Sequence, residues 1–171
     1  RIGESCRIGP NSVLKDSNLG ARCQVVSSML EGASLEADVD VGPFAHLRPG
    51  THVGKKTHIG NFVEVKESKL GMGVKSGHFS YIGDADVGDN VNIGAGTVIA
   101  NFDGAVKHRT TIEENAFIGS NTTLIAPVRV GKDASTGAGA VVTKNVDAGD
   151  MVIGVPARPI SKNSDRKPEK A

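Results

Sequence analysis

Large aliphatic residues recur every six positions along most of the chain. The clearest run begins at residue 41 and reads VGPFAH, LRPGTH, VGKKTH, IGNFVE. The first position of a hexad is Ile, Leu or Val except at Ser76, Thr136 and Ala148. The fifth position is always small, and the second is glycine in fourteen of nineteen hexads. These hexads begin at residues 2, 8, 19, 35, 41, 47, 53, 59, 70, 76, 87, 93, 112, 118, 124, 130, 136, 142 and 148.

A period of six predicts neither an amphipathic helix nor a simple strand. A helix repeats apolar residues about every 3.6 positions and a half-buried strand every two. One large and one small inward residue in six positions instead predicts a coil of short strands. Three hexads form one triangular coil, and coils stack at about 4.8 Å, the spacing between strands. We therefore expect an all-β fold with large residues inside a prism and small residues at its corners.

The hexads resemble the hexapeptide-repeat family, [LIV]-G-x-x-[STAV]-x, along almost the whole chain. This resemblance implies a left-handed parallel β-helix, and the handedness rests on it alone because crossover connections are usually right-handed. It also implies a homotrimer with active sites at subunit interfaces. We expect one β-helix domain over residues 1–160 and a flexible polar tail over 161–171.

Breaks in the repeat predict loops, which often carry function. The longest break is an insertion of seven residues between Ile99 and Ile112, which predicts an inserted loop near 100–111. Residues 25–31 also leave the register, and we expect an irregular coil there.

The register brings two cations together. Arg48 and Lys66 are eighteen residues apart and both occupy second positions that are normally glycine. They should stack in adjacent coils, with Glu64 and Tyr81 beside them. Two such cations repel, and an anion such as a phosphate would relieve the repulsion. A solvated cationic edge neutralised by Glu64 is the alternative.

His78 lies two residues after Ser76, between two one-residue slips of the frame. With an ordinary pKa near 6.5, a histidine can accept a proton from an amine at neutral pH. His78 is therefore a candidate general base, although a surface histidine without a role is the alternative.

Two other groups suggest metal or redox chemistry. His46, His52 and His58 recur every six residues but should lie on successive faces of the prism, so we expect no metal site within one chain. Zinc at a trimer interface stays a rival. Cys6 and Cys23 stack at fifth positions, close enough for a disulfide, but buried free thiols are the expected state.

Composition narrows the function classes. Twenty Lys and Arg against nineteen Asp and Glu leave almost no net charge, which favours neither a nucleic-acid nor a membrane partner. No apolar run approaches the ~18 residues of a membrane span, and the charged start is unlike a signal peptide. We expect a cytoplasmic protein.

Longer segments carry a closer resemblance: GPFAHLRPG from residue 42, IGNFVEVK from 59, GHFSYIGD from 77, VNIGAGT from 91, NFDGAVK from 101 and FIGSN from 117. Their order and spacing are similar to the acetyltransferase domains of bifunctional glucosamine-1-phosphate acetyltransferase/N-acetylglucosamine-1-phosphate uridyltransferases. The resemblance implies acetyl transfer from acetyl-CoA to glucosamine 1-phosphate. That step leads to UDP-N-acetylglucosamine and peptidoglycan precursors. The chain carries no uridyltransferase segment, so we expect that it does not itself make a UDP-sugar.

The same resemblance implies roles for eleven residues and requires no metal. His78 matches the general base, with Asn101 in the acetyl region and backbone N–H groups near Ala95 stabilising the oxyanion. Phe102 stands where the family often has tyrosine. Arg158, in GVPAR, is a candidate for a CoA phosphate. The sugar-phosphate positions are Arg48, Lys66, Tyr81, Asn92 and Lys107, and the remaining acetyl-CoA positions are Ala95, Ser120 and Ala138.

Two alternatives stay open. One is a hexapeptide acyltransferase for another amino or nucleotide sugar. The other is a non-catalytic β-helix that trimerises a partner domain.

Overall fold

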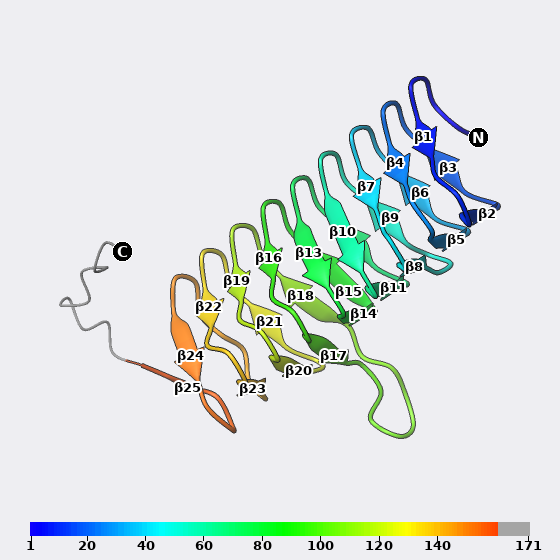
Figure 1. Ribbon diagram of the computed structural model, residues 1–171. Coiled ribbons are helices and arrows are strands. Elements are labelled where there is room, and N and C mark those ends of the chain that lie inside the picture. Colours follow the sequence, from blue (N-terminus) through cyan, green and yellow to red (C-terminus); the bar gives the residue numbers. More distant parts are fainter. Residues whose placement is uncertain (161–171) are drawn as a thin grey trace.

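The computed structural model describes residues 1–160, which form a solenoid of short strands (Figure 1). Three sheets of ten, eight and seven strands run along its length. Neighbours such as β10 and β13 pair in parallel, whereas the last pair, β24 and β25, is antiparallel. The result is a parallel β-solenoid of about nine turns, consistent with the left-handed β-helix that the hexads predict. The tail expected at 161–171 lies outside the described residues.

From β1 to β21, each turn contributes one strand to each sheet. The first sheet contains β1 (Arg7–Ile8), β4 (Gln24–Val25), β7 (Asp40–Val41), β10 (His58–Asn61), β13 (Lys75–His78), β16 (Asn92–Ile93), β19 (Phe117–Ile118), β22 (Ser135–Thr136), β24 (Met151–Ile153) and β25 (Arg158–Pro159). The second contains β2 (Val13–Lys15), β5 (Met29–Glu31), β8 (His46–Leu47), β11 (Glu64–Lys66), β14 (Tyr81–Gly83), β17 (Val98–Ala100), β20 (Thr123–Ile125) and β23 (Val141–Val142). The third contains β3 (Asn18–Leu19), β6 (Ser34–Leu35), β9 (His52–Val53), β12 (Lys69–Leu70), β15 (Ala85–Val87), β18 (Thr110–Ile112) and β21 (Arg129–Val130).

The core is the column of first-position side chains. Leu47, Ile59 and Ile82 are fully buried, and Ile59 is in register with Val41 and Ser76 in the adjoining turns. Because the large first-position residue points inward in most hexads, apolar side chains stack from turn to turn along the prism. Burying a side chain of this size stabilises the fold by about 1.5–3 kcal/mol, so the repeat is also the main source of stability.

The corners are tight, which explains the small residues. Buried hydroxyls at fifth positions bond to backbone carbonyls, as Thr51 Oγ1 does to Val65 O at 3.1 Å. At the second position, a Cβ on Gly94 would lie 2.5 Å from the backbone nitrogen of Ser120. Glycine is therefore required there by the close approach of the next turn.

Two details of the predicted register are wrong. Residues 25–31 are not an irregular coil, because Val25 and Leu30 are both fully buried and lie in β4 and β5. A spacing of five still places a large residue inward when the corner is shortened by one residue. The hexad framed at Ala148 does not form a strand either. Val152 pairs with Thr136 in the first sheet, and Val146 bridges to Val130 in the third.

The insertion lies where it is expected. It leaves the second sheet after β17 and enters the third at β18, and it projects from the solenoid as a long loop (Figure 1). The strands on either side keep their register, because Val98 pairs with Thr123 and Ala85 with Thr110. Residues 101–109, called here the inserted loop, are therefore added outside an intact turn.

Two further expectations concern the cysteines and the membrane. Cys6 and Cys23 are both free thiols. Cys23 is buried, as expected, and burial raises the pKa of its thiol, whereas Cys6 is only half-buried. Within residues 1–160 there is no helix with the length and hydropathy needed to cross a membrane.

Candidate active site

The second sheet brings the expected cations together. β8 pairs with β11 so that Leu47 faces Val65, which places Arg48 beside Lys66 in adjacent turns. Glu64 of β11 lies in register with Tyr81 of β14, the next strand of the same sheet. The stacking of Arg48 and Lys66 predicted from their spacing of eighteen residues is therefore confirmed.

The two cations have different surroundings. Arg48 donates a hydrogen bond from Nη1 to Oε1 of Glu64 at 2.8 Å, and this bond raises the pKa of Arg48. Glu64 thus neutralises Arg48, as in the alternative of a solvated edge. Lys66 Nζ instead lies 3.9 Å from Oδ2 of Asp84, with only 16% of its side chain exposed.

A third cation joins Lys66 from the inserted loop. The ammonium of Lys66 lowers the pKa of Lys107 below its ordinary value, and the carboxylate of Asp84 opposes this effect. The main cause is the positive charge of Lys66, which disfavours a second positive charge on Lys107. The argument for an anion therefore applies more strongly to Lys66 and Lys107 than to Arg48 and Lys66.

Asn101 is 7% exposed and lies at the start of the inserted loop. Its Nδ2 donates to Oδ2 of Asp84 in a short hydrogen bond and to Oη of Tyr81 at 3.4 Å. Both amide hydrogens are thus engaged, and the group left for a ligand is the Oδ1 acceptor. From the sequence, we expect Asn101 to help stabilise an oxyanion. To do so it would have to break one of these bonds, because an oxyanion needs a hydrogen-bond donor.

Gly83 allows this arrangement. A Cβ at Gly83 would lie 2.5 Å from Oη of Tyr81 and 2.8 Å from Nδ2 of Asn101. The absence of a side chain at position 83 lets the Tyr81 ring and the Asn101 amide occupy the same corner.

The inserted loop is held by its own polar contacts. Asp103 accepts hydrogen bonds from the backbone of Ala105 and Val106, both at 2.8 Å, and from Nε2 of His108 at 2.6 Å. These bonds, with the Val106 N–H first among them, hold the pKa of Asp103 well below its usual range. The backbone of Phe102 bridges to that of Lys107, so the loop presents Lys107 on a short hairpin.

The far end of the loop is anchored by an ion pair. Arg109 donates to both carboxylate oxygens of Asp86, at 2.6 and 2.9 Å, and to the backbone oxygen of Glu67 at 3.2 Å. Sequence reasoning missed these contacts, together with Gly83, Asp84 and Asp103. The DG turn after Phe102 was the one local signal, because aspartate before glycine is typical of a turn with side-chain to backbone bonds.

His78 lies on the first sheet. It ends β13, in register with Asn61 of β10, and its side chain is exposed. Asn92 starts the next strand of that sheet, β16, in register with Lys75. The structure therefore places two of the expected site residues on the first sheet. Lys66 and Tyr81 lie on the second sheet, and Asn101 and Lys107 lie in the inserted loop that follows it. Within residues 1–160, no hydrogen bond or ion pair joins the His78 side chain to those four.

The expected acetyl-CoA positions form a stripe of small residues along the next corner. Asn121 N–H donates to Ala95 O at 2.7 Å and Gly139 N–H to Ser120 O at 2.8 Å, so Ala95, Ser120 and Ala138 follow one another in successive turns. Ser120 and Ala138 are exposed.

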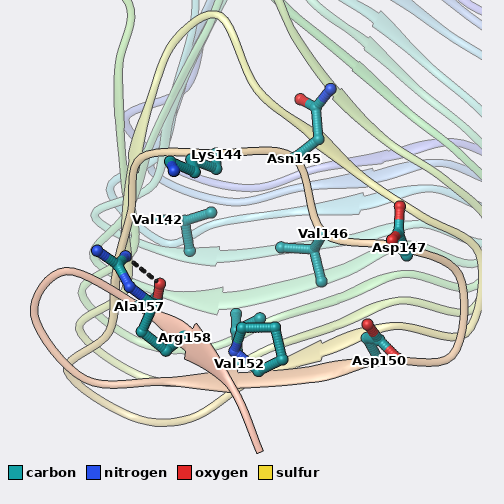
Figure 2. Close-up of a pocket in the computed structure, with 10 residues that line it drawn as sticks. Val142, Lys144, Asn145, Val146, Asp147, Asp150, Val152, Ala157 and Arg158 are labelled. Atoms are coloured by element: carbon teal, nitrogen blue, oxygen red, sulfur yellow. Dashed lines mark hydrogen bonds between the residues drawn. The ribbon is translucent and has the colours of Figure 1, made fainter.

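Arg158 lies one turn beyond the stripe. It pairs with Ile153 in the antiparallel β24–β25 pair and lines a cavity of about 270 Å³ at the C-terminal end of the solenoid (Figure 2). Three buried valines, among them Val142, also line this cavity, together with Lys144. None of the sugar-phosphate candidates lines it, so Arg158 can at most serve the far end of a ligand lying along the stripe.

The three regularly spaced histidines do not form one cluster. His46, His52 and His58 lie in β8, β9 and β10, one in each sheet, as the register predicts. Each is paired with an acidic residue of the preceding turn: Glu31, Glu36 and Asp40, respectively. In the described part of the chain, no group of three or more potential metal ligands is found.

The fold and the site together define a class of protein: a hexapeptide-repeat β-helix with a cationic corner and an exposed histidine. Comparison with known proteins agrees. Residues 109–144 match the model of the bacterial transferase hexapeptide (six repeats) family. Among solved structures, PerB of Caulobacter crescentus, in complex with CoA and GDP-perosamine, has a TM-score of 0.56 at 18% identity, covering 79% of this chain and 70% of PerB. That likeness supports the fold alone.

Curated relatives are more similar. The bifunctional protein GlmU of Synechococcus sp. (strain CC9605) is 52% identical over 153 residues, which are 90% of this chain and 34% of that protein. GlmU of Methylococcus capsulatus is 49% identical over 171 residues, 99% of this chain and 37% of that protein. The chain thus spans about a third of the length of these relatives. The resemblance to the acetyltransferase portion of such bifunctional proteins is confirmed.

Proposed function

We propose that the chain catalyses acetyl transfer from acetyl-CoA to the 2-amino group of glucosamine 1-phosphate, giving N-acetylglucosamine 1-phosphate. The observation that carries the proposal is the pair of lysines, Lys66 and Lys107, held beside Asn101 and Tyr81 where a phosphosugar can bind. Similarity to GlmU proteins over nine tenths of the chain supports the same activity.

The proposed chemistry assigns one task to each group. Acetyl-CoA supplies an acetyl group bound to sulfur as a thioester. The sugar nitrogen forms a bond to the acetyl carbon, the carbon–sulfur bond breaks, and CoA leaves as a thiolate. An ammonium cannot attack, so His78 takes the proton that the nitrogen gives up, an effect worth about 10²–10⁴ in rate. The proton then passes to the thiolate or to solvent.

Residues of the second sheet and the inserted loop are proposed to bind and orient the phosphosugar. Lys66 and Lys107 hold the phosphate, and Arg48 contributes once Glu64 gives way. The Oδ1 atom of Asn101 accepts a hydrogen bond from the sugar amine. Fixing the phosphate at one end orients the nitrogen at the other, which is a large part of catalysis when two substrates must meet.

The acetyl-CoA arm is proposed to lie along the stripe Ala95, Ser120 and Ala138. Side chains larger than alanine or serine are absent at these three positions, and Ser120 and Ala138 are exposed. Arg158 then lies near the end of the stripe where a CoA phosphate would be. The same need for acetyl-CoA is the reason to propose a cytoplasmic location.

We further propose that the site is completed between subunits of a homotrimer. His78 and Asn92 lie on the first sheet, whereas Lys66 lies at the far edge of the second and Asn101 and Lys107 lie in the inserted loop beyond it. A neighbouring subunit is proposed to bring the two groups together. Exposed aromatic residues lie at the corner between those sheets: Phe44 and Phe62 stack with ring centres 5.4 Å apart, and Phe79 follows in the next turn. An apolar surface of this kind is typical of a subunit contact.

The test is an acetyl-transfer assay with purified protein, acetyl-CoA and a panel of amino sugars. Glucosamine 1-phosphate should be acetylated, glucosamine much more slowly, and His78→Ala should fold normally but lose at least about 10²-fold in kcat. Equal rates with glucosamine 1-phosphate and with glucosamine would contradict the proposal that Lys66 and Lys107 bind the phosphate. The absence of both turnover and acetyl-CoA binding would favour a non-catalytic trimerisation module.

A further inference from the structure

We propose that Asp84 is a positioning residue for acetyl transfer. Its carboxylate fixes which face of the Asn101 amide meets the substrate and holds Lys66 beside Lys107. This inference rests on the proposed function, because it assigns a task to a residue that touches the groups of the same site.

Asp84 is placed firmly by its backbone. It follows β14 with a left-handed φ of 51°, its N–H donates to Lys66 O at 3.0 Å, and its carbonyl accepts from Thr110 N–H at 3.0 Å. Lys66 lies in the turn before it, and Thr110 follows the inserted loop. The side chain is 18% exposed, so its direction is set by the two turns that enclose it.

The chemistry of a carboxylate makes the contact with Asn101 directional. An ionised carboxylate accepts hydrogen bonds and cannot donate them, whereas an amide has one end of each kind. Oδ2 of Asp84 therefore requires Nδ2 of Asn101, and Oη of Tyr81 lies on the same side of the amide. These two bonds engage the Nδ2 end of the amide, so in the proposed complex the Oδ1 end is the one that accepts a hydrogen bond from the sugar amine. A neutral amide at position 84 could satisfy either end of Asn101.

The charge of Asp84 acts on the lysines. Its Oδ2 lies 3.9 Å from Nζ of Lys66, and it opposes the fall in the pKa of Lys107 that Lys66 causes. Without Asp84, the two ammonium groups would repel with no nearby carboxylate between them. Asp84 thus places a negative charge beside Lys66 and favours the charged form of Lys107 before a phosphate arrives.

The variant that tests this role is Asp84→Asn, which keeps the size of the side chain and tolerates a left-handed backbone. Asp38→Asn is the matched control, since Asp38 also has positive φ, at 62°, and is paired to Arg22 at 2.6 Å. Both variants are compared with the wild type for kcat and KM with glucosamine 1-phosphate, for the pH dependence of kcat/KM, and for Tm.

For Asp84→Asn we expect kcat to fall at least about tenfold, a loss of about 1.4 kcal/mol in transition-state stabilisation. KM for glucosamine 1-phosphate should not rise, because a negative charge is removed near its phosphate. The alkaline limb of kcat/KM should move to lower pH, because Lys107 loses its proton more easily. Asp38→Asn should leave kcat, KM and the alkaline limb of kcat/KM unchanged. An unchanged kcat in Asp84→Asn, or a fall that follows only from a lower Tm, would overturn the inference.

A readout without turnover separates this inference from the proposed function. The side-chain amide hydrogens of Asn101 should exchange slowly with solvent in the wild type and faster in Asp84→Asn, as measured by NMR. If the exchange is slow in the wild type and faster in Asp84→Asn, the positioning role is supported even if glucosamine 1-phosphate proves not to be the acceptor. Wild-type turnover with equal exchange in both proteins would remove the role and leave the proposed function intact.

Discussion

In the inserted loop, Nε2 of His108 donates a hydrogen bond to Oδ2 of Asp103 at 2.6 Å. This bond joins the two arms of the hairpin that carries Lys107, one residue before His108. The loop contributes no large side chain to the core, and Phe102 and Val106 are more than half exposed. Its conformation therefore depends on polar contacts, and its function depends on whether those contacts keep Lys107 beside Lys66.

Removal of the Asp103 carboxylate should loosen the loop without unfolding the protein. In Asp103→Ala, three hydrogen bonds are lost at an exposed site, so Tm should change little while trypsin cleaves faster after Lys107 and Arg109. KM for glucosamine 1-phosphate should rise about tenfold, the effect of losing about 1.4 kcal/mol of binding. Asp103→Asn retains one hydrogen-bond acceptor, so its KM and its rate of trypsin cleavage should lie between those of the wild type and Asp103→Ala. Equal trypsin cleavage in Asp103→Ala and wild type would show that the loop is held by other contacts.

A methyl group at position 83 should disturb the site and spare the core. In Gly83→Ala the new Cβ would meet Oη of Tyr81 and Nδ2 of Asn101, both ends of side chains that can move away. We expect a normal Tm and at least about a tenfold loss of kcat, since misplacement of about 1 Å can be that costly. Gly77→Ala is a folding control, because the nearest atom to its Cβ would be 3.8 Å away. Full activity in Gly83→Ala would mean that Tyr81 and Asn101 need not share the corner.

The anchor of the loop should make stability depend on pH in the acid range. The hydrogen bond from Arg109 lowers the pKa of Asp86 in the folded state below the ordinary value of about 3.9. A lowered folded pKa gives stability that is present above the unfolded value and is lost as the pH falls through the folded value. Because the side chains of both residues are 45% exposed, solvent screening limits the effect to about 0.2–1 kcal/mol.

This predicts that Asp86→Asn has a lower Tm than the wild type at pH 7. The difference should begin to shrink near pH 4 and disappear once the pH is below the lowered folded pKa of Asp86. Salt should also reduce the difference at pH 7. Asp16→Asn is the control, since Asp16 takes part in no ion pair within residues 1–160. A difference in Tm between wild type and Asp86→Asn that persists at pH 2 would contradict the ion-pair explanation.

Active sites shared between subunits should allow two inactive variants to rescue each other. His78→Ala changes a residue of the first sheet and Lys107→Ala one of the inserted loop, so a mixed trimer can contain interfaces with both residues intact. For random assembly of a cyclic trimer, about a quarter of the sites should be restored. The measurement is the acetyl-transfer rate of the two variants refolded together, compared with each refolded alone. No recovery in trimers shown to be mixed would mean that each site is built from one chain.

The sequence alone was sufficient for most of the fold. A large residue every six positions determines which side chains enter the core, and this preference is local, so it predicts the strands, the three sheets and the place of the inserted loop. The stacking of Arg48 on Lys66 follows from the same period. The errors at 25–31 and at Ala148 arose where corners are shortened, because a spacing of four or five can still place an aliphatic residue inward.

The partners of the charged groups were decided by the tertiary structure. Nothing in the period of six indicates that Glu64 neutralises Arg48, that Asp84 meets the amide of Asn101, or that Lys107 returns to Lys66 from a projecting loop. These contacts join residues of different turns through side chains that are not part of the repeat. The core is specified by one residue type at one position, whereas the site depends on the directions of individual polar side chains, which are fixed only when neighbouring turns enclose them.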